Sequence, residues 1–261
     1  MSELELAISR PIAILTLNRP EQHNAVSYAM WQALPDLCSR LAADTAVRVV
    51  ICRGQGREAF SAGGDIVEFR EQRSNRPQAE QYNRHVQTAL DALLALPQPT
   101  IALIHGFCVG GGLLLAAHCD LRIASGSARF GLPVAKLGFL ITYEQMQRFV
   151  HLLGAGAVAD LLLTARLLGA EEARVLGLCS QVHPPETLDE AVESLAQRMA
   201  ELSPQYMEET AVAAVAFFFP DVGVSCAALS RVSTSFPLSQ GLTTKSVAPS
   251  FIPRTARSMS A

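Results

Sequence analysis

The chain of 261 residues has almost no lysine, no excess of charge and no long apolar run. Only Lys136 and Lys245 are lysines, and 24 acidic residues stand against 21 basic ones. This near balance gives none of the dense positive charge that nucleic-acid binding requires, so no nucleic-acid partner is expected. The apolar runs stay below the roughly 18 residues that cross a bilayer, and the N-terminus has no signal-peptide pattern. We therefore expect a cytoplasmic protein with no membrane partner.

The cysteines also lack any spacing typical of a metal site or a disulfide framework. No Cys-x-x-Cys pair occurs, and each thiol stands among apolar neighbours, so we predict buried, reduced cysteines and no metal. The Gly-x-Ser-x-Gly nucleophile motif is absent as well. The six cysteines are Cys38, Cys52, Cys108, Cys119, Cys179 and Cys226.

What the sequence does contain is a glycine-rich stretch, His105–Asp120, which reads HGFCVGGGLLLAAHCD. It follows an apolar strand predicted at 100–104 and passes through Gly110–Gly112 into a segment of helical composition. The first amides of a helix have no partner inside the helix and carry the positive end of its dipole, so they can bind an anion or a polarised carbonyl. A second interpretation is that the glycines only let a neighbouring backbone pack closely.

Two phosphate-binding motifs do not match this stretch. A P-loop needs lysine and then serine or threonine after its last glycine, and Leu113 and Leu114 occupy those positions. A dinucleotide fingerprint needs spaced glycines and an acidic residue about 20 positions later, and neither is present. A functional role for this loop therefore requires a second segment elsewhere in the chain.

A second glycine loop lies upstream, at Ala59–Asp65 (AFSAGGD). It follows a continuous β-branched pattern at 47–52, which predicts a buried strand. Asp65 is placed to open the next helix as its N-cap, and we prefer that role to a chemical one. Two strands therefore each end in a glycine loop that leads into a helix.

Together these segments resemble the crotonase superfamily, the enoyl-CoA hydratase/isomerase family. The likeness rests on NRPEQHNA at 18–25, AFSAGGD at 59–65 and HGFCVGGG at 105–112, and it continues in order through FGLPVAKLG at 130–138. It covers roughly the first two hundred residues, and several ordered motifs are more specific than one. The resemblance implies an α/β fold, a spiral of ββα turns at 1–200, followed by an atypical helical or tail region at 201–261.

The resemblance also implies a chemistry. In that family two backbone amides, one from each glycine loop, bind the thioester oxygen of an acyl-CoA and stabilise the anion that forms. The corresponding amides here are those of Gly64 and Gly111. The family likewise implies a homotrimer or a dimer of trimers, and no cofactor other than the coenzyme A of the substrate. The residues that it assigns to substrate binding are Ala25, Ala62, Gly64, Asp65, Ile66, Gly111 and Tyr143.

The chain departs from the family at the two positions that matter most for hydration. Hydratases of the family carry two glutamates there, as acid and base, and this sequence has Leu114 and Val134 instead. Neither side chain transfers a proton, and acid–base assistance is typically worth about 10²–10⁴-fold. Ordinary hydration should therefore be severely reduced, and isomerisation by the second glutamate is disfavoured too.

Some relatives place an acid on the next loop, which corresponds to Thr142 here, with Tyr143 and Glu144 beside it. One interpretation makes Thr142 a helix N-cap and Glu144 an ordinary first-turn acid. The other makes Glu144 the proton-transfer group of the site, with Tyr143 as the second candidate. Both remain open from the sequence.

Hydrophobic periodicity predicts the other elements. Ser27 should cap a helix whose stripe, from Met30 and Trp31 to Leu41, belongs to the core rather than to a ligand site. Beyond 201 the charged motif with which the family usually ends is missing, and 211–219 predicts a buried or oligomer-facing helix. We predict further strands at 12–18, 121–124 and 129–130, and further helices at 78–96, 113–117, 144–153, 157–163, 170–176 and 188–202.

Two hypotheses follow. In the first, the chain is an acyl-CoA enzyme whose paired amides support chemistry that does not need both glutamates, such as decarboxylation, thioester hydrolysis or isomerisation with a displaced acid. In the second, it is a non-catalytic acyl-CoA-binding protein that kept the fold and lost the acids. Because both glycine loops are intact, the sequence favours the enzyme.

Overall fold

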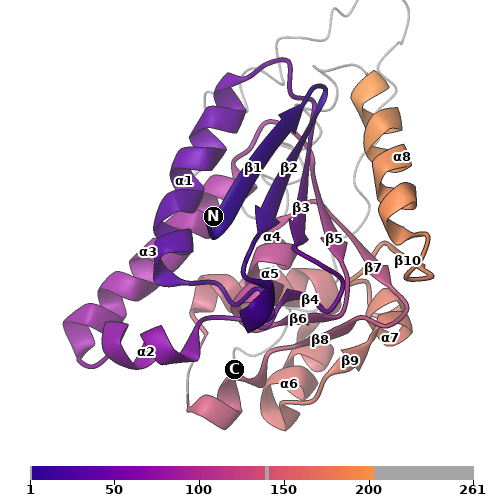
Figure 1. Ribbon diagram of the computed structural model, residues 1–261. Helices are drawn as coiled ribbons and strands as arrows, with labels where there is room; N and C mark the ends of the chain where they lie inside the picture. Colours follow the sequence, from indigo (N-terminus) through magenta and orange to yellow (C-terminus); the bar gives the residue numbers. More distant parts are fainter. Residues whose placement is uncertain (1, 139–140, 203–261) are drawn as a thin grey trace, which may run out of the picture.

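The computed structural model describes residues 2–138 and 141–202, which contain a six-stranded sheet in the order β1-β2-β3-β5-β7-β10 (Figure 1). Strand β1 runs antiparallel to β2, and the other neighbours are parallel. Parallel neighbours need crossover connections, and here helices and a second sheet provide them. The strands are β1 (Leu4–Ser9), β2 (Ile12–Leu17), β3 (Val49–Gly54), β5 (Thr100–Ile104), β7 (Leu121–Ser125) and β10 (Gln181–His183).

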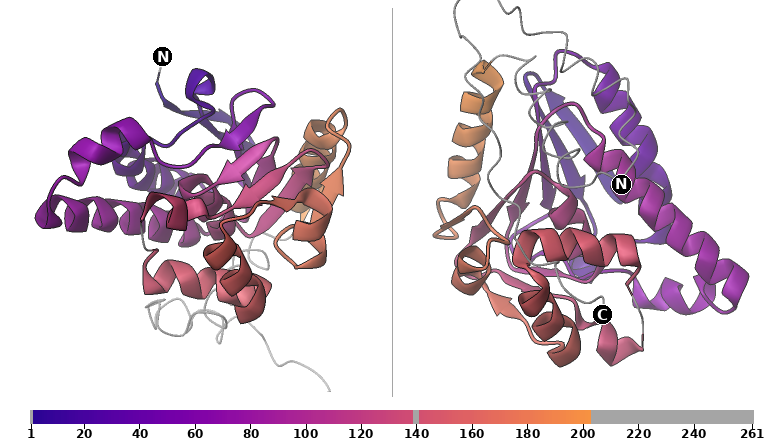
Figure 2. Two further views of the ribbon diagram at one scale, coloured as in Figure 1. Left: turned by 90° about the horizontal axis from the view of Figure 1, so that it is seen from below. Right: turned by 180° about the vertical axis from the view of Figure 1, so that it is seen from behind.

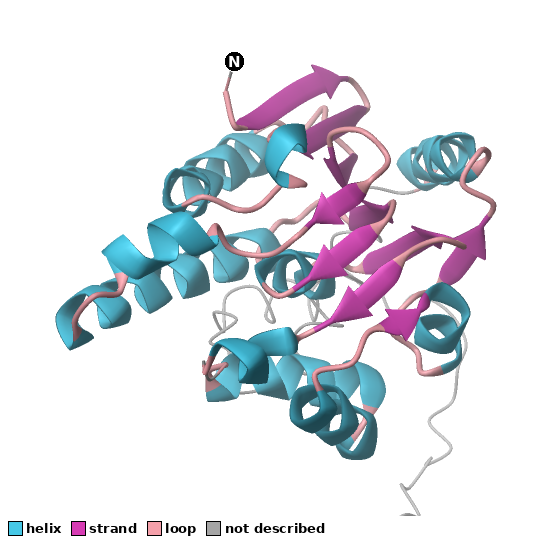
Figure 3. Cartoon of the chain, turned by 60° about the horizontal axis from the view of Figure 1, so that its bottom comes forward, coloured by secondary structure: helices cyan, strands magenta, loops and turns pink. Residues whose placement is uncertain are grey.

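A second, smaller sheet has the order β4-β6-β8-β9 and lies at one end of the molecule (Figure 3). Its first three strands are parallel, and β9 is antiparallel to β8. The strands are β4 (Ala59–Ser61), β6 (Phe107–Val109), β8 (Arg129–Gly131) and β9 (Leu168–Gly169).

The chain alternates between the two sheets. Strands β3, β5 and β7 lie in the large sheet, and each is followed by its successor in the small sheet, β4, β6 or β8. Each pair then leads into helical structure, which confirms the predicted spiral of ββα turns. The helices after these pairs are α2 (Ile66–Gln72) with α3 (Arg76–Leu94), α4 (Gly111–His118), and α5 (Tyr143–Leu153) with α6 (Ala155–Thr164).

Helices lie on both sides of the large sheet (Figure 2). Successive side chains of a strand point to opposite sides, so Val50 and Cys52 pack towards α1 (Tyr28–Ala43), α3 and α4, while Val49 and Ile51 pack against α8 (Leu188–Glu201). Apolar residues on both sides explain why the β3 segment is continuously hydrophobic. The remaining elements are η1 (Pro20–Gln22), η2 (Pro133–Leu137) and α7 (Ala170–Val175).

Helix α4 lies inside the protein, and all its residues from Gly112 to His118 are buried. Its C-terminal carbonyls still need donors. The buried Arg122 guanidinium donates to the carbonyl oxygens of Ala116 and Cys119, at 3.4 and 2.6 Å, and Arg148 donates to that of Ala117 at 2.6 Å. Two positively charged side chains therefore stabilise the negative, C-terminal end of the α4 dipole.

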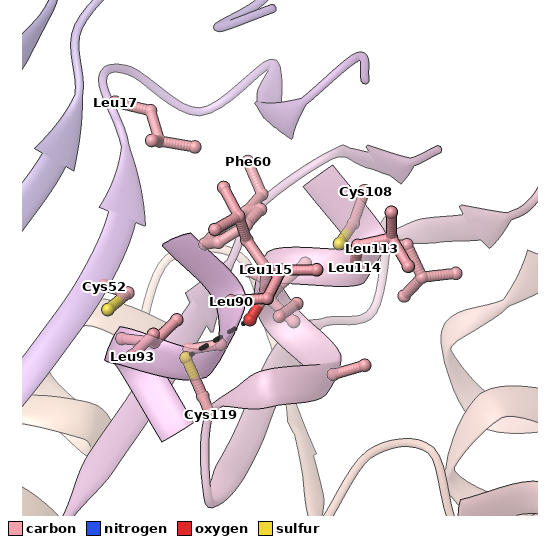
Figure 4. Close-up of a cluster of buried hydrophobic side chains, with 14 of the residues drawn as sticks. Leu17, Cys52, Phe60, Leu90, Leu93, Cys108, Leu113, Leu114, Leu115 and Cys119 are labelled. Atoms are coloured by element: carbon pink, nitrogen blue, oxygen red, sulfur yellow. Dashed lines mark hydrogen bonds between the residues drawn. The ribbon is translucent and has the colours of Figure 1, made fainter. Parts of the chain in front are cut away.

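Sulfur atoms form part of the packing around α4 (Figure 4). Cys52, Cys108 and Cys119 are buried with Phe60 and the leucines of α4, and Cys119 Sγ lies 3.7 Å from the Leu115 carbonyl oxygen. Burial raises the pKa of the Cys108 thiol. Every cysteine in the described part of the chain is free and buried, as predicted.

Most predicted elements are confirmed, including the helix capped by Ser27, whose oxygen accepts from the Met30 amide. Strands β1, β4, β6, β9 and β10 were not predicted. The proposed tail, with the helix expected at 211–219, lies outside the described residues, so the division at residue 200 stays a prediction. Among the helices that are described, none is long and apolar enough to cross a membrane.

Candidate active site

The pairing of β4 with β6 brings the two glycine loops together. The two strands are parallel, with Ala59 opposite Phe107 and Ser61 opposite Cys108. The carboxyl ends of parallel neighbours meet at one edge of a sheet, so Gly63–Gly64 and Gly110–Gly112 leave that edge side by side. The two loops predicted from separate strands therefore form one site.

The loops approach so closely that side chains do not fit between them. A Cβ atom on Gly111 would lie 3.3 Å from Gly64 N and 3.2 Å from Trp31 Cζ2. A Cβ atom on Gly112 would lie 2.5 Å from Ser61 Cβ and 2.8 Å from Ser61 O. Gly110 has a φ of 53°, a conformation that L side chains rarely adopt. The glycines are thus required both by contact and by conformation.

The close contact of the two loops leaves two backbone amides available to bind a ligand atom. Neighbouring groups are engaged, because Val26 N donates to Gly63 O and Asp65 N donates to Val26 O, at 2.7 and 3.1 Å. Within the described residues, the amides of Gly64 and Gly111 have no such partner. Gly111 is the first residue of α4, so its amide also carries the positive end of that helix dipole.

These amides open onto a pocket that is mostly apolar and aromatic. Among the described residues that line it there is no carboxylate, histidine or cysteine, and Arg73 and Tyr82 are the titratable side chains. The lining consists of Trp31, Gly64, Ile66, Phe69, Arg73, Tyr82, Asn83, Val86, Gly110, Gly111, Leu114, Leu132, Val134, Ile141, Thr142 and Gln145.

The two positions at which the resembled family carries glutamates both face this pocket. Leu114 comes from the first turn of α4 and Val134 from η2, and both belong to the lining. Leu114 is almost fully buried. Both apolar side chains therefore lie in the pocket itself.

The structure does not bring Glu144 into the pocket. Its side chain is exposed, as is that of Tyr143, and neither is a lining residue. Thr142 caps α5 by accepting from Gln145 N at 3.4 Å, and the buried Gln145 lines the pocket instead. Successive helix residues are turned by about 100°, so the pocket-facing position is one residue beyond Glu144. This placement leaves Glu144 the role of a first-turn helix residue.

The other predicted substrate residues divide into two groups. Ile66 lines the pocket at its exposed side, whereas Ala25 and Ala62 are not lining residues. Asp65 caps α2 by accepting from the amides of Val67 and Glu68, which confirms its helix-opening role. Asp65 also lies 2.8 Å from Arg19, and the hydrogen bond from that guanidinium holds the pKa of its carboxyl below the usual range.

Sequence reasoning missed the aromatic side of the pocket. Trp31 was assigned to a core stripe, and its side chain is indeed only 2% exposed, but one edge lines the pocket. Tyr82 of α3 packs edge-on against Phe69, with 5.3 Å between the ring centroids, and the Arg73 guanidinium lies 4.5 Å above the Phe69 ring. Burial lowers the pKa of Arg73 and raises that of Tyr82 to about 12.

Comparisons with known proteins agree with this geometry. The sequence profile of the enoyl-CoA hydratase/isomerase family matches residues 7–217. A short-chain-enoyl-CoA hydratase of Clostridium acetobutylicum is 33% identical over 193 residues, 74% of this chain and 73% of its own. An (E)-benzylidenesuccinyl-CoA hydratase of Thauera aromatica is 34% identical, over 80% of this chain and 81% of its own. The crystal structure of an enoyl-CoA hydratase/carnithine racemase from Magnetospirillum magneticum superimposes with a TM-score of 0.83 at 36% identity, covering 88% of this chain and 86% of that one.

The contact between the loops predicts a stability effect. In Gly112→Ala the new methyl group meets Ser61 backbone, so we expect the free energy of unfolding to fall by about 1–3 kcal/mol. Gly156→Ala is the control, because its Cβ meets nothing within 4 Å in α6, and removing a helical glycine should stabilise by up to about 1 kcal/mol. Urea denaturation of both variants measures the difference. Equal stability of the two would contradict the close approach of the loops.

Proposed function

The chain belongs to the enoyl-CoA hydratase/isomerase family, and from this we propose that it binds an acyl-CoA thioester with the carbonyl oxygen between the amides of Gly64 and Gly111. The observation that supports this proposal is the pair of converging amides that have no partner in the described structure. Preorganised amides aimed at a developing oxyanion are worth about 2.7–4 kcal/mol each. The reaction should therefore pass through an enolate or a related anion.

The residues that line the pocket limit the classes of reaction that it can catalyse. Hydration, double-bond migration and thioester hydrolysis each need a group that takes up a proton from water or from carbon. None of the described lining residues is a carboxylate or a histidine. Decarboxylation of a malonyl-type thioester needs no such base, because the breaking carbon–carbon bond itself delivers its electron pair to the enolate. We therefore propose decarboxylation as the reaction class.

Leu114 and Val134 suit this reaction. An apolar environment penalises a carboxylate and favours its conversion to neutral carbon dioxide. A glutamate at either position would add a like charge beside the substrate carboxylate and disfavour its binding. The same two residues that disable hydration therefore fit a substrate that carries its own negative charge.

Turnover distinguishes this reaction from hydration and from mere binding. Malonyl-CoA, methylmalonyl-CoA, crotonyl-CoA and a 3-hydroxyacyl-CoA would be incubated with the protein and analysed by mass spectrometry. We expect loss of carbon dioxide from a malonyl-type thioester, and hydration of crotonyl-CoA slower by at least about 10²-fold than by a relative with both glutamates. Fast hydration would refute the argument from Leu114 and Val134. Tight binding with no turnover of any thioester would favour the non-catalytic acyl-CoA-binding alternative.

The amide of Gly111 can be tested against its own side-chain control. Gly111→Pro removes the N–H group at the first helical position, where proline is otherwise tolerated, whereas Gly111→Ala adds a Cβ and keeps the N–H group. We expect kcat of the proline variant to be lower than that of the alanine variant by about 10²-fold or more. Circular dichroism checks the fold of both. Similar kcat values would exclude the Gly111 amide from oxyanion binding.

The pH dependence follows from the titratable groups of the pocket. Burial raises the pKa of Tyr82 to about 12, so its neutral form is lost only as the pH rises through that value. No other described lining residue except Arg73 titrates. We expect kcat to vary less than about threefold between pH 6 and pH 9, without the bell shape that a carboxylate or histidine pair produces. A bell-shaped profile centred near neutrality would contradict the base-free reaction.

A further inference from the structure

Trp31 and Tyr82 reach both glycine loops from the aromatic side of the pocket. They come from neighbouring helices, α1 and α3, and are only 2% and 6% exposed. The Tyr82 hydroxyl oxygen lies 3.4 Å from the point that a Cβ atom on Gly64 would occupy. Trp31 Cζ2 lies 3.2 Å from the corresponding point on Gly111. A thioester oxygen held by the two amides would thus have the Tyr82 hydroxyl group and the edge of the Trp31 ring as neighbours.

The Trp31 indole nitrogen is an unsatisfied donor. Its Nε1–H group is buried and makes no regular hydrogen bond with any residue that the structure describes. Such a group costs about 1–3 kcal/mol when it is left without a partner. It lies near enough to the Tyr82 hydroxyl group to oppose the rise in the pKa of the phenol that burial causes. The two polar groups are therefore neighbours, but the indole N–H group makes no regular hydrogen bond to the phenolic oxygen.

This arrangement orients the tyrosine proton. An indole N–H group only donates, so it can interact favourably with the phenolic oxygen only when the phenolic hydrogen points in another direction. That oxygen lies 3.4 Å from the Cβ position of Gly64, and both residues line the pocket. Because the pKa of Tyr82 is about 12, the phenol keeps its proton at neutral pH. The pocket therefore holds a protonated phenol beside Gly64.

We propose that the Tyr82 hydroxyl is the acid that protonates the enolate carbon, with Trp31 as the positioning residue that orients it. This inference rests on the proposed decarboxylation. The bond between the α-carbon and the carboxylate breaks, carbon dioxide leaves, and the electron pair forms the enolate that the Gly64 and Gly111 amides stabilise. The α-carbon then takes the phenolic proton, and the O–H electron pair stays on the oxygen. Trp31 Nε1–H stabilises the phenolate until water returns a proton, so the cycle consumes one proton.

The surroundings of Tyr82 support this role. Its ring stacks on Tyr28 at 5.5 Å between centroids, with an interplanar angle of 15°, and packs edge-on against Phe69. Arg73 lies 5.6 Å above the Tyr82 ring, and its charge favours the phenolate. Glu68 and Asp65 act weakly in the opposite sense. Three neighbouring side chains therefore hold the ring in place, and Tyr82 still lines the pocket.

Tyr28 provides the matched control. It is the ring stacked on Tyr82, but it does not line the pocket, and its hydroxyl is bonded to His85 Nδ1 at 2.6 Å. Tyr28→Phe removes a hydroxyl from the same aromatic cluster without touching the site. Tyr82→Phe removes the proposed acid and keeps the ring.

The experiment is decarboxylation of methylmalonyl-CoA in D₂O, which makes the α-carbon of the product stereogenic. The wild type and Tyr28→Phe should place deuterium on one face. Tyr82→Phe should lower kcat by about 10²-fold or more, with KM within about threefold, and deuterate both faces. Trp31→Phe should keep one-faced deuteration and lose about tenfold in kcat. Because Trp31 is the only tryptophan of the chain, its emission reports thioester binding by the Tyr82 variant.

The outcomes separate the two proposals. No loss of carbon dioxide from malonyl-type thioesters with the wild type would overturn decarboxylation and the acid role together. Decarboxylation by the wild type, combined with full kcat and one-faced deuteration in Tyr82→Phe, would overturn the Tyr82 role alone. If Tyr82→Phe fails to fold by circular dichroism, Trp31→Phe decides, because an unchanged kcat there would refute the positioning of the phenol.

Discussion

The whole site depends on the close contact of two backbone segments, 63–64 and 110–112. Parallel pairing of β4 with β6 sets the two segments at the same sheet edge, and the absence of side chains lets them touch. A single methyl group on Gly112 would already collide with Ser61. The contact places two amides side by side, and everything else in the pocket, from the aromatic wall to the leucine of α4, is arranged around that pair.

Helix α4 connects the site to the core. Its first residue, Gly111, provides one amide, and its buried body fixes the direction in which that amide points. Burying a helix end normally leaves carbonyls without donors. Arg122 and Arg148 solve this at the far end of α4 by donating to its last carbonyl oxygens. The charges that stabilise the helix therefore lie at the opposite end from the pocket.

The sequence predicted the strands, the glycine loops and the cap at Asp65 because each is encoded by a short local pattern. Strands β1, β4, β6, β9 and β10 were missed because tertiary pairing rather than local composition defines them. Periodicity correctly identified the buried face of α1, but it does not reveal that one edge of Trp31 meets a cavity. Which of Glu144 and Gln145 faces the pocket depends on about 100° of rotation around the helix axis. Counting positions along the sequence from a motif does not determine that rotation. No sequence motif marks Tyr82, and its position in the pocket is found only from the structure, in which α3 lies beside α1.

The reactivity of the buried thiols around α4 can report local opening of the protein. Cys52 and Cys119 lie beside the same helix that supplies the Gly111 amide, and Cys108 lies in the strand just before it. Reaction with a thiol reagent requires a thiolate and access, and burial removes both. Labelling at these positions should therefore proceed only through transient separation of α4 from the sheet. The rate of modification at each cysteine would measure how often that separation occurs, and a bound ligand that holds the two glycine loops together would slow it.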